Sequence, residues 1–226
     1  MTTLDPLAQR RLRFLLGFLA YFVVIWALWD QTLIYPLKIF VVFLHEVSHG
    51  FAAIATGGGI QRIEITPDQG GVCFCGGGST FLTLSAGYLG SLLWGIAMLM
   101  LARAPGRWHF YGLFALGLLV LGVTILYVRS GFGIVFGLLF GLALIGAAKY
   151  LPLGLQAIML TVLGLTSCLY AILDIKSDII DRPEIRSDAR MLAELTGIPT
   201  VLWGLLWIVL ALAVSWWLLG RLYKKA

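Results

Sequence analysis

Phe43-Leu44-His45-Glu46-Val47-Ser48-His49-Gly50 is the stretch on which the interpretation of this sequence depends. Two histidines four residues apart on a helix point to the same side, about one turn from each other. A glutamate beside the first can act next to a metal ion that both histidines hold, as in the zinc-binding pattern H-E-x-x-H. The surrounding residues are apolar, and ionisable groups are costly inside a bilayer, so the stretch predicts an intramembrane functional site.

The composition predicts a membrane protein. Of the 226 residues, 60% are hydrophobic and only 12% are charged, with a mean hydropathy of +0.96, whereas soluble domains carry roughly 25% charged residues. The net charge of +5 does not indicate a nucleic-acid partner, because the basic residues lie at the ends of apolar segments, where they anchor a protein at the bilayer surface. We therefore expect one membrane-embedded domain over residues 1–226, in contact with lipid.

The apolar segments predict an all-α polytopic membrane protein with about seven transmembrane helices and a small β-hairpin after the second. Each segment is close to the ~20 residues that a bilayer requires. Residues 1–11 read as a polar arm, and residues 176–199 as a polar loop with a short helix that Ser187 would cap. The expected spans cover about 12–29, 33–56, 81–101, 110–128, 133–151, 155–175 and 200–219.

The expected hairpin covers residues 60–75. Ile63 and Ile65 alternate with Arg62 and Glu64, a turn rich in proline and glycine follows, and a second short apolar run completes the pair. An open sheet edge cannot face lipid. The hairpin must therefore lie in water, at the membrane interface, or in a cavity lined by protein.

Three cysteines in a chain of this length do not predict a disulfide framework. Cys73 and Cys75 project to one face of the second strand, and at that spacing we expect no bridge between them. A second metal site there is conceivable, although ordinary strand residues are the favoured interpretation. Cys168 lies in an apolar span.

The distribution of lysine and arginine favours a cytoplasmic N-terminus. In that orientation nine basic residues lie on the cytoplasmic side and seven on the outer side. The first apolar run lacks a small-residue cleavage site, so we expect a retained span rather than a signal peptide.

The chemistry that these residues allow is hydrolysis. A hydrolytic zinc site takes three protein ligands and leaves a fourth position for water. His45 and His49 would supply two ligands, and Glu46 would be the general base that takes a proton from that water.

The third ligand has to come from elsewhere in the chain, and His109 is a poor candidate because it lies beyond the third span at the opposite membrane face. Asp174 is favoured, because the second and sixth spans run in the same direction and carry their polar residues in the same half of the membrane. Asp178, one turn further on, is the second choice. Asp181 and Asp188 are loop residues with more freedom.

The sequence resembles the site-2 proteases, a family of intramembrane zinc metalloproteases, and in particular their compact bacterial branch. The motif at 45–50, the glycine-bounded hairpin, Ser85-Ala86-Gly87-Tyr88-Leu89-Gly90 and Asp174 carry the resemblance, which covers most of the chain from about residue 40 onward. The chain departs from that family in three respects. Ile175 follows Asp174 where glycine is expected, the fourth and fifth spans look inserted, and there is no room for a PDZ domain.

The resemblance implies one zinc ion per chain, held by His45, His49 and Asp174, with Glu46 as the catalytic residue. It also implies a bacterial inner-membrane location and a hairpin that pairs with an unwound substrate strand. We therefore expect a zinc endopeptidase that hydrolyses a membrane protein near the cytoplasmic face. Two alternatives stay open: an inactive zinc-binding relative that sequesters a membrane partner, and a transporter-like bundle whose histidines line an ion path.

Overall fold

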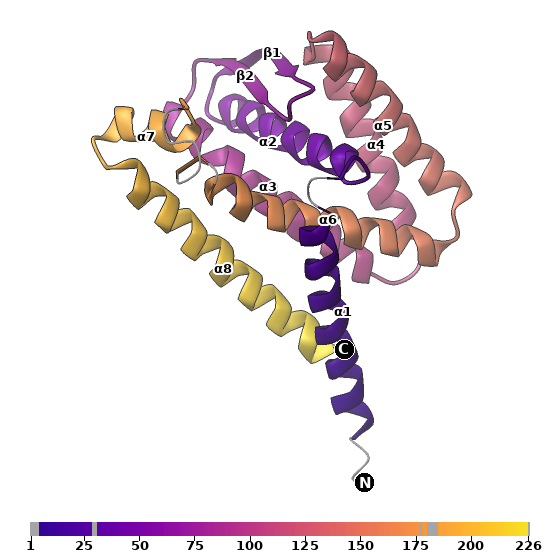
Figure 1. Ribbon diagram of the computed structural model, residues 1–226. Coiled ribbons are helices and arrows are strands. Elements are labelled where there is room, and N and C mark those ends of the chain that lie inside the picture. The colour runs from indigo at the N-terminus through magenta and orange to yellow at the C-terminus, as the bar shows by residue number, and fades with distance from the viewer. Residues whose placement is uncertain (1–4, 29–30, 177, 180–184, 226) are drawn as a thin grey trace.

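The computed structural model of the chain describes residues 5–28, 31–176, 178–179 and 185–225. Within these ranges the protein is mostly helical, with one antiparallel pair of strands (Figure 1). Asp181 and Trp29, the last residue of the first expected span, lie outside the described residues. The elements are α1 (Pro6–Ala27), α2 (Tyr35–Ala55), β1 (Gly59–Ile65), β2 (Gly71–Gly76), α3 (Thr80–Arg103), α4 (Trp108–Tyr127), α5 (Gly131–Tyr150), α6 (Leu153–Lys176), α7 (Asp188–Thr196) and α8 (Thr200–Lys225).

Helix α2 is the centre of the molecule. Its side chains at Ile39, Phe43, Leu44 and Val47 are fully buried, because α3 and α6 pack on it together with the hairpin. Figure 1 shows the α4–α5 pair on one flank and α7 with α8 on the other. Burial from so many directions means that a polar group in the middle of α2, between Lys38 and Gly50, contacts protein rather than lipid.

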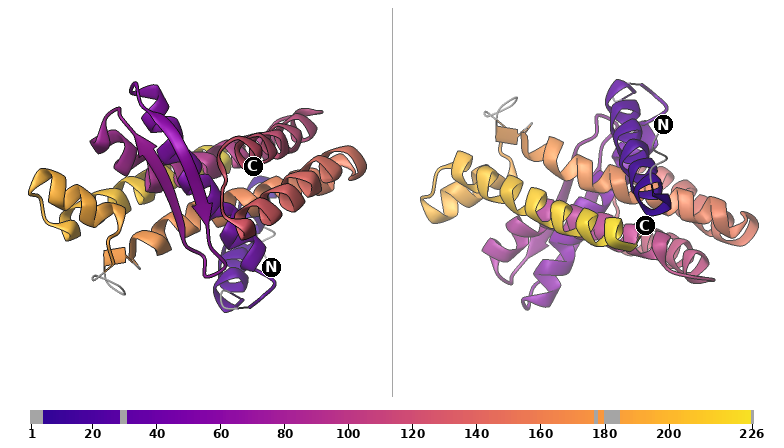
Figure 2. Two further views of the ribbon diagram at one scale, coloured as in Figure 1. Left: turned by 90° about the horizontal axis from the view of Figure 1, so that it is seen from above. Right: turned by 90° about the horizontal axis from the view of Figure 1, so that it is seen from below.

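The hairpin lies along α2. Seen from above, its strands run across the direction of α4, α5 and α6 (Figure 2). Ile63 and Ile65 are fully buried, while Arg62 donates from its Nε to Glu64 Oε1 over 2.7 Å on the more exposed face. The predicted alternation and the predicted hairpin are therefore confirmed.

The outer edge of β1 is covered by the link between α4 and α5. The Arg129 N–H donates to the Ile63 carbonyl over 3.0 Å. The Ser130 hydroxyl accepts from the Ile65 N–H over 2.9 Å and donates to the Ile65 carbonyl over 2.8 Å. In the part of the chain that the structure describes, the sheet has only these two strands, so the outer edge of β2 pairs with no further strand.

One expectation about the hairpin was wrong. Cys73 and Cys75 form a disulfide, with their Cα atoms 5.6 Å apart. Disulfides require a Cα separation of roughly 4.4–6.8 Å, and the shortened strand falls inside that range. The ladder also shifts register between Ile60 and Arg62, opposite this part of β2.

The helix pair α3–α6 is held together by small residues. A Cβ atom added at Gly95 of α3 would lie 2.8 Å from the Gly164 carbonyl oxygen of α6, and the Ser167 hydroxyl donates to the Ser91 carbonyl over 2.7 Å. Close backbone approach of this kind is how helices pack in lipid. The small residues on this face of α3 thus form a packing surface.

The predicted count of seven transmembrane helices is not confirmed. Among the described residues, five helices are long and apolar enough to span a bilayer, namely α2 to α6. Helix α1 begins within the residues predicted as a polar arm and carries Arg10, Arg11 and Arg13 in its first half. In α8 an apolar helical stretch covers Thr200–Val214. The short helix α7 follows its predicted cap, since the Ser187 hydroxyl accepts from the Arg190 N–H over 3.4 Å.

Candidate metal centre

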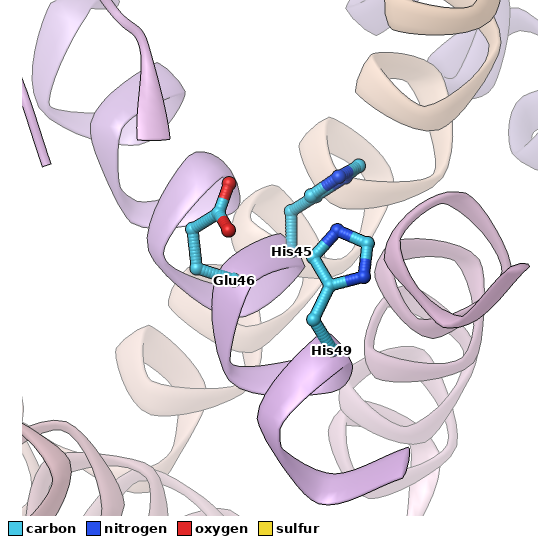
Figure 3. Close-up of side chains that lie close together, drawn as sticks. All are labelled: His45, Glu46 and His49. Atoms are coloured by element: carbon cyan, nitrogen blue, oxygen red, sulfur yellow. The ribbon is translucent and has the colours of Figure 1, made fainter. Parts of the chain in front are cut away.

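Three ionisable side chains project from neighbouring positions of α2 and lie close together. Helical spacing puts His45 and His49 on the same side of the helix, with ring centroids 4.8 Å apart. One ligand atom from each histidine and one from Glu46 all lie within 4.8 Å of one another. Figure 3 shows the two imidazole rings side by side, with the Glu46 carboxylate projecting from the adjacent part of the helix. The residues singled out by the motif therefore form one cluster.

Asp188 completes this cluster from a distant part of the chain. It is the first residue of α7, and its Oδ2 atom lies 3.0 Å from His45 Nε2 and 3.1 Å from His49 Nε2. A single carboxylate oxygen thus faces the corresponding nitrogen of both histidines. All three side chains are largely shielded from solvent, with 9–12% of their side-chain surface exposed.

The two aspartates that the sequence favoured lie further out. Asp174, near the end of α6, places its Oδ2 atom 3.7 Å from Nδ1 of His45, the nitrogen that faces away from Asp188. Asp178 accepts a hydrogen bond from the Tyr88 hydroxyl, and the Tyr88 ring lies edge-on to His45 with centroids 5.4 Å apart. Asp174 thus contacts the His45 ring and Asp178 contacts the Tyr88 hydroxyl, whereas Asp188 contacts both histidines.

His49 is oriented by the backbone of α3. Its Nδ1 atom lies 2.7 Å from the Thr83 carbonyl oxygen, which can only accept, so Nδ1 carries the proton. In the neutral ring the Nε2 atom is then a lone-pair donor 3.1 Å from a carboxylate oxygen. Two electron-rich atoms at that separation need a positive species between them, either a proton or a metal cation. A ligating histidine whose second nitrogen donates to a carbonyl is the usual arrangement in metal sites.

Gly87 leaves space at the centre of the cluster. A Cβ atom added at this position on α3 would collide with His45 Nε2 and lie 2.7 Å from Asp188 Oδ2. Any side chain other than hydrogen would therefore enter the space that both ligand atoms face. The donor set and this space fit a small cation such as zinc, for which two imidazole nitrogens and a carboxylate oxygen are common ligands.

Strand β2 lies directly against Glu46. A Cβ atom added at Gly71 would lie 2.7 Å from both Cγ and Oε1 of Glu46, so the backbone of the strand packs directly on this side chain. The glutamate is thus held between its own helix and the strand. Its side chain has little freedom to turn away from the histidines.

Burial and neighbouring charges shift the pKa of Asp188 in opposite directions. Its burial would raise the pKa of the carboxyl, but the neighbouring His49 and His45 outweigh burial and leave the pKa well below its usual range. An ionised carboxylate is the form that binds metals.

The cluster opens into a pocket of about 400 Å³. Its walls come from α2, the hairpin turn with β2, the start of α3, the end of α6 and the region around the start of α7. The lining residues that matter for the chemistry are His45, Glu46, His49, Gly71, Cys73, Asp174, Asp178 and Asp188. The volume lies in the range of small-molecule and peptide side-chain pockets, roughly 300–1,000 Å³.

Comparison with known proteins identifies the family. The family model described as Peptidase M50B-like matches residues 18–218, and the chain belongs to this family. Neither the curated proteins nor the solved structures gave a match. Family membership supports a metallopeptidase, and together with the five apolar helices it indicates an integral membrane protein. The predicted resemblance to the site-2 protease family agrees with this result.

Sequence reasoning placed Asp188 among the loop residues and did not anticipate the Thr83 carbonyl. A signal for Asp188 was present, because the cap predicted at Ser187 makes the next residue the first of a helix and so restricts its position. Nothing in the residue types could have indicated a backbone carbonyl as the partner of His49.

Proposed function

We propose that the protein is an intramembrane zinc endopeptidase of the site-2 protease type. The observation that carries this proposal is the position of Asp188 Oδ2, 3.0 and 3.1 Å from the Nε2 atoms of His45 and His49. Zinc–nitrogen and zinc–oxygen bonds of about 2.0–2.1 Å in a tetrahedral site put neighbouring ligand atoms roughly 3.3 Å apart. Each of the two nitrogen–oxygen distances needs to change by only a few tenths of an ångström to meet that separation.

The sequence favoured Asp174 as the third ligand, whereas these distances favour Asp188. We therefore assign the ligand set His45, His49 and Asp188. Asp174 would instead accept from Nδ1 of His45 and orient the ring, as the Thr83 carbonyl does for His49. Each ligating histidine then has a partner on its second nitrogen.

The proposed chemistry requires one general base. When bound, zinc would supply a water molecule of lowered pKa and polarise the carbonyl of the scissile peptide bond. Glu46 would accept the proton of the attacking water and then pass it to the leaving amine. The close packing of Gly71 would hold the Glu46 carboxylate in position for both transfers.

The substrate would be a membrane protein whose chain is extended at the point of cleavage. Opposite residues in an antiparallel pair both point their backbone groups inward or both point them outward. The backbone N–H and C=O groups of Ile63 and Ile65 point away from β2, toward residues 128–130. The backbone groups of their partners Cys73 and Gly71 therefore point away from β1. A substrate strand added to this edge would lie beside Glu46, the β-augmentation mode of peptide binding.

The proposed reaction would take place near the cytoplasmic face of a bacterial inner membrane. This assignment rests on the balance of basic residues, which favours a cytoplasmic N-terminus. With that orientation α2 runs toward the cytoplasm, and the hairpin and α7 lie on the cytoplasmic side of the site.

Replacement of Glu46 by glutamine tests the mechanism. Glutamine keeps the shape of the side chain but cannot take a proton, so we expect cleavage of a membrane-protein substrate in proteoliposomes to fall by at least ~10²-fold. Zinc content should stay near that of the wild type, because Glu46 is not a ligand. Unchanged cleavage by Glu46→Gln would exclude the mechanism, and a zinc-containing wild type that cleaves no membrane protein offered would favour an inactive, partner-binding relative.

A further inference from the structure

The turn of the hairpin contains a residue in an unusual backbone conformation. Gln69 has a φ of 67°, and among the described residues it is the only one other than glycine with a positive φ. A residue with a Cβ atom adopts this left-handed conformation at a cost in free energy, whereas glycine adopts it freely. Glycine at position 69 would therefore suit the backbone of the turn better than glutamine does.

Contacts around the turn hold this conformation in place. The Tyr35 hydroxyl, at the start of α2, donates to the Pro67 carbonyl over 2.6 Å, and the Thr66 N–H donates to the Gly70 carbonyl over 2.9 Å. A strained residue persists where the surrounding structure fixes its conformation, and such residues gather at functional sites. The strain at Gln69 points to a role for its side chain.

Gln69 forms part of the wall of the pocket that contains the two histidines. It is half-buried, whereas residues 66–68 of the same turn are exposed. Within the described part of the chain, its side-chain amide has no hydrogen-bond partner. The amide is thus available to a molecule that enters the pocket.

The edge that β2 offers to a substrate strand ends beside Gln69. The backbone groups of Gly71 and Cys73 point away from β1, and the next such position in a regular strand is residue 69. There the left-handed conformation replaces the extended one, so the backbone leaves the strand. A substrate that extends past Gly71 therefore needs another partner for its next peptide group, because a peptide group without a partner away from water costs free energy.

We propose that Gln69 is a substrate-binding residue whose side-chain amide continues the β2 edge beyond Gly71. The amide carries a carbonyl oxygen and an NH₂ group, which match the acceptor and the donor of a peptide group. It pairs with one peptide group of an extended substrate through two hydrogen bonds. Gly70 and Gly71 have no side chains to block this approach, and neighbouring strands lie about 4.7–4.9 Å apart, a distance that a glutamine side chain spans.

This inference rests on the proposed endopeptidase function and on strand pairing at β2. It names the backbone of an extended peptide as the group that Gln69 recognises, so the contact does not depend on the substrate's side chains. A backbone contact away from the reacting atoms is equally strong in the ground state and in the transition state. Loss of such a contact raises KM and leaves kcat unchanged.

The experiment measures peptide binding apart from proteolysis. The full-length Glu46→Gln protein in detergent is titrated with a fluorescein-labelled peptide of alternating valine and threonine, residues that favour an extended conformation, and fluorescence anisotropy gives the dissociation constant. We expect Gln69→Ala in this background to raise the dissociation constant at least ~5-fold, because two hydrogen bonds are lost. The matched control is Gln31→Ala, which removes the amide of an exposed glutamine outside the pocket wall and should not change it.

A second measurement separates peptide binding from folding. Gln69→Gly and Gln69→Ala both remove the amide and should bind the peptide equally weakly. Only glycine relieves the left-handed conformation, so the unfolding midpoint of Gln69→Gly should lie about 2–4 °C above that of Gln69→Ala. Gln69→Asn adopts this conformation readily and keeps a shorter amide, so it should combine the higher midpoint with part of the affinity.

Three results would overturn the proposal. They are equal peptide affinity in Gln69→Ala and its Glu46→Gln parent, no peptide binding to that parent, and an unfolding midpoint of Gln69→Gly no higher than that of Gln69→Ala.

Cleavage assays with Glu46 restored distinguish this proposal from the proposed function. Gln69→Ala should raise KM for a membrane-protein substrate and keep kcat. Cleavage with an unchanged KM would refute the role of Gln69 and leave the endopeptidase function intact. Absence of cleavage in every variant, with peptide binding that still depends on Gln69, would count against the endopeptidase function and support the binding role.

Discussion

Single atoms decide the roles of the acidic residues. One oxygen of Asp188 faces the Nε2 atoms of both histidines, whereas Asp174 reaches only Nδ1 of His45, over 3.7 Å. A ligand and a residue that orients a ligand have different effects on metal binding. Loss of a ligand removes the site, but loss of an orienting partner typically weakens affinity by 10–100-fold.

We therefore expect Asp188→Asn to be isolated without stoichiometric zinc, whereas Asp174→Asn keeps it with roughly 10–100-fold weaker affinity. The measurement is metal content per chain after purification without chelators, followed by competition with a chromophoric chelator. The reverse pattern, with zinc lost only in Asp174→Asn, would restore Asp174 as the third ligand.

Gly87 provides a second test at the scale of one residue. A methyl group there would enter the space between His45 Nε2 and Asp188 Oδ2, so Gly87→Ala should lose most of its zinc while the helices stay folded. The matched control is Gly122→Ala on α4, where a Cβ atom meets nothing within 4 Å. Equal zinc content in the two variants would mean that the space beside Gly87 is not the metal position.

At the scale of elements, the cap of α7 positions Asp188. The Ser187 hydroxyl accepts from the Arg190 N–H, and replacing such a cap by alanine costs about 0.5–2 kcal/mol. If this free energy is lost from zinc binding, Ser187→Ala should weaken the zinc affinity by roughly 2–30-fold. Ser187→Thr keeps a capping hydroxyl and should weaken the zinc affinity less. Chelator competition gives both affinities, and indistinguishable values for the two variants would separate the cap from the site.

The elements differ in how far the sequence predicted them. The hairpin could be anticipated because Ile63 and Ile65 alternate with charged residues between glycine clusters, and α2 because its motif lies in a continuous apolar run. The disulfide could not, since it depends on a local shortening of β2 to a Cα separation of 5.6 Å that no residue type encodes.

The sequence predicted the part of the site that lies on one helix and not the part that depends on the path of the chain. His45, Glu46 and His49 belong to one helix, so their spacing fixes their geometry. The approach of Asp188 depends on the path of the chain between α6 and α7, which the sequence does not specify.

At the scale of the whole molecule, the proposed metal joins α2 to α7, two elements that lie far apart in the chain. His45 and Asp188 are 143 positions apart in the chain, and the α7–α8 end packs on the rest mainly through Tyr88, Leu192, Trp203 and Trp207. A ligand that binds only the folded state stabilises it, by about 2.7 kcal/mol at a concentration 100-fold above its dissociation constant. Zinc held between α2 and α7 should therefore stabilise the whole chain and the α7–α8 end most of all.

Removal of zinc by a chelator should lower the thermal unfolding midpoint of the wild-type protein by several degrees, and added zinc should restore it. Amide exchange should rise first in residues 187–207, because the metal is the polar link between that segment and α2. Asp188→Asn should already unfold at the lower temperature and should not respond to chelator or zinc, since it has lost the ligand on the α7 side. Glu46→Gln is the control that should respond as the wild type does, because it keeps all three ligands. A chelator effect of the same size in Asp188→Asn would show that the stabilising metal binds elsewhere and that α2 and α7 are held together without it.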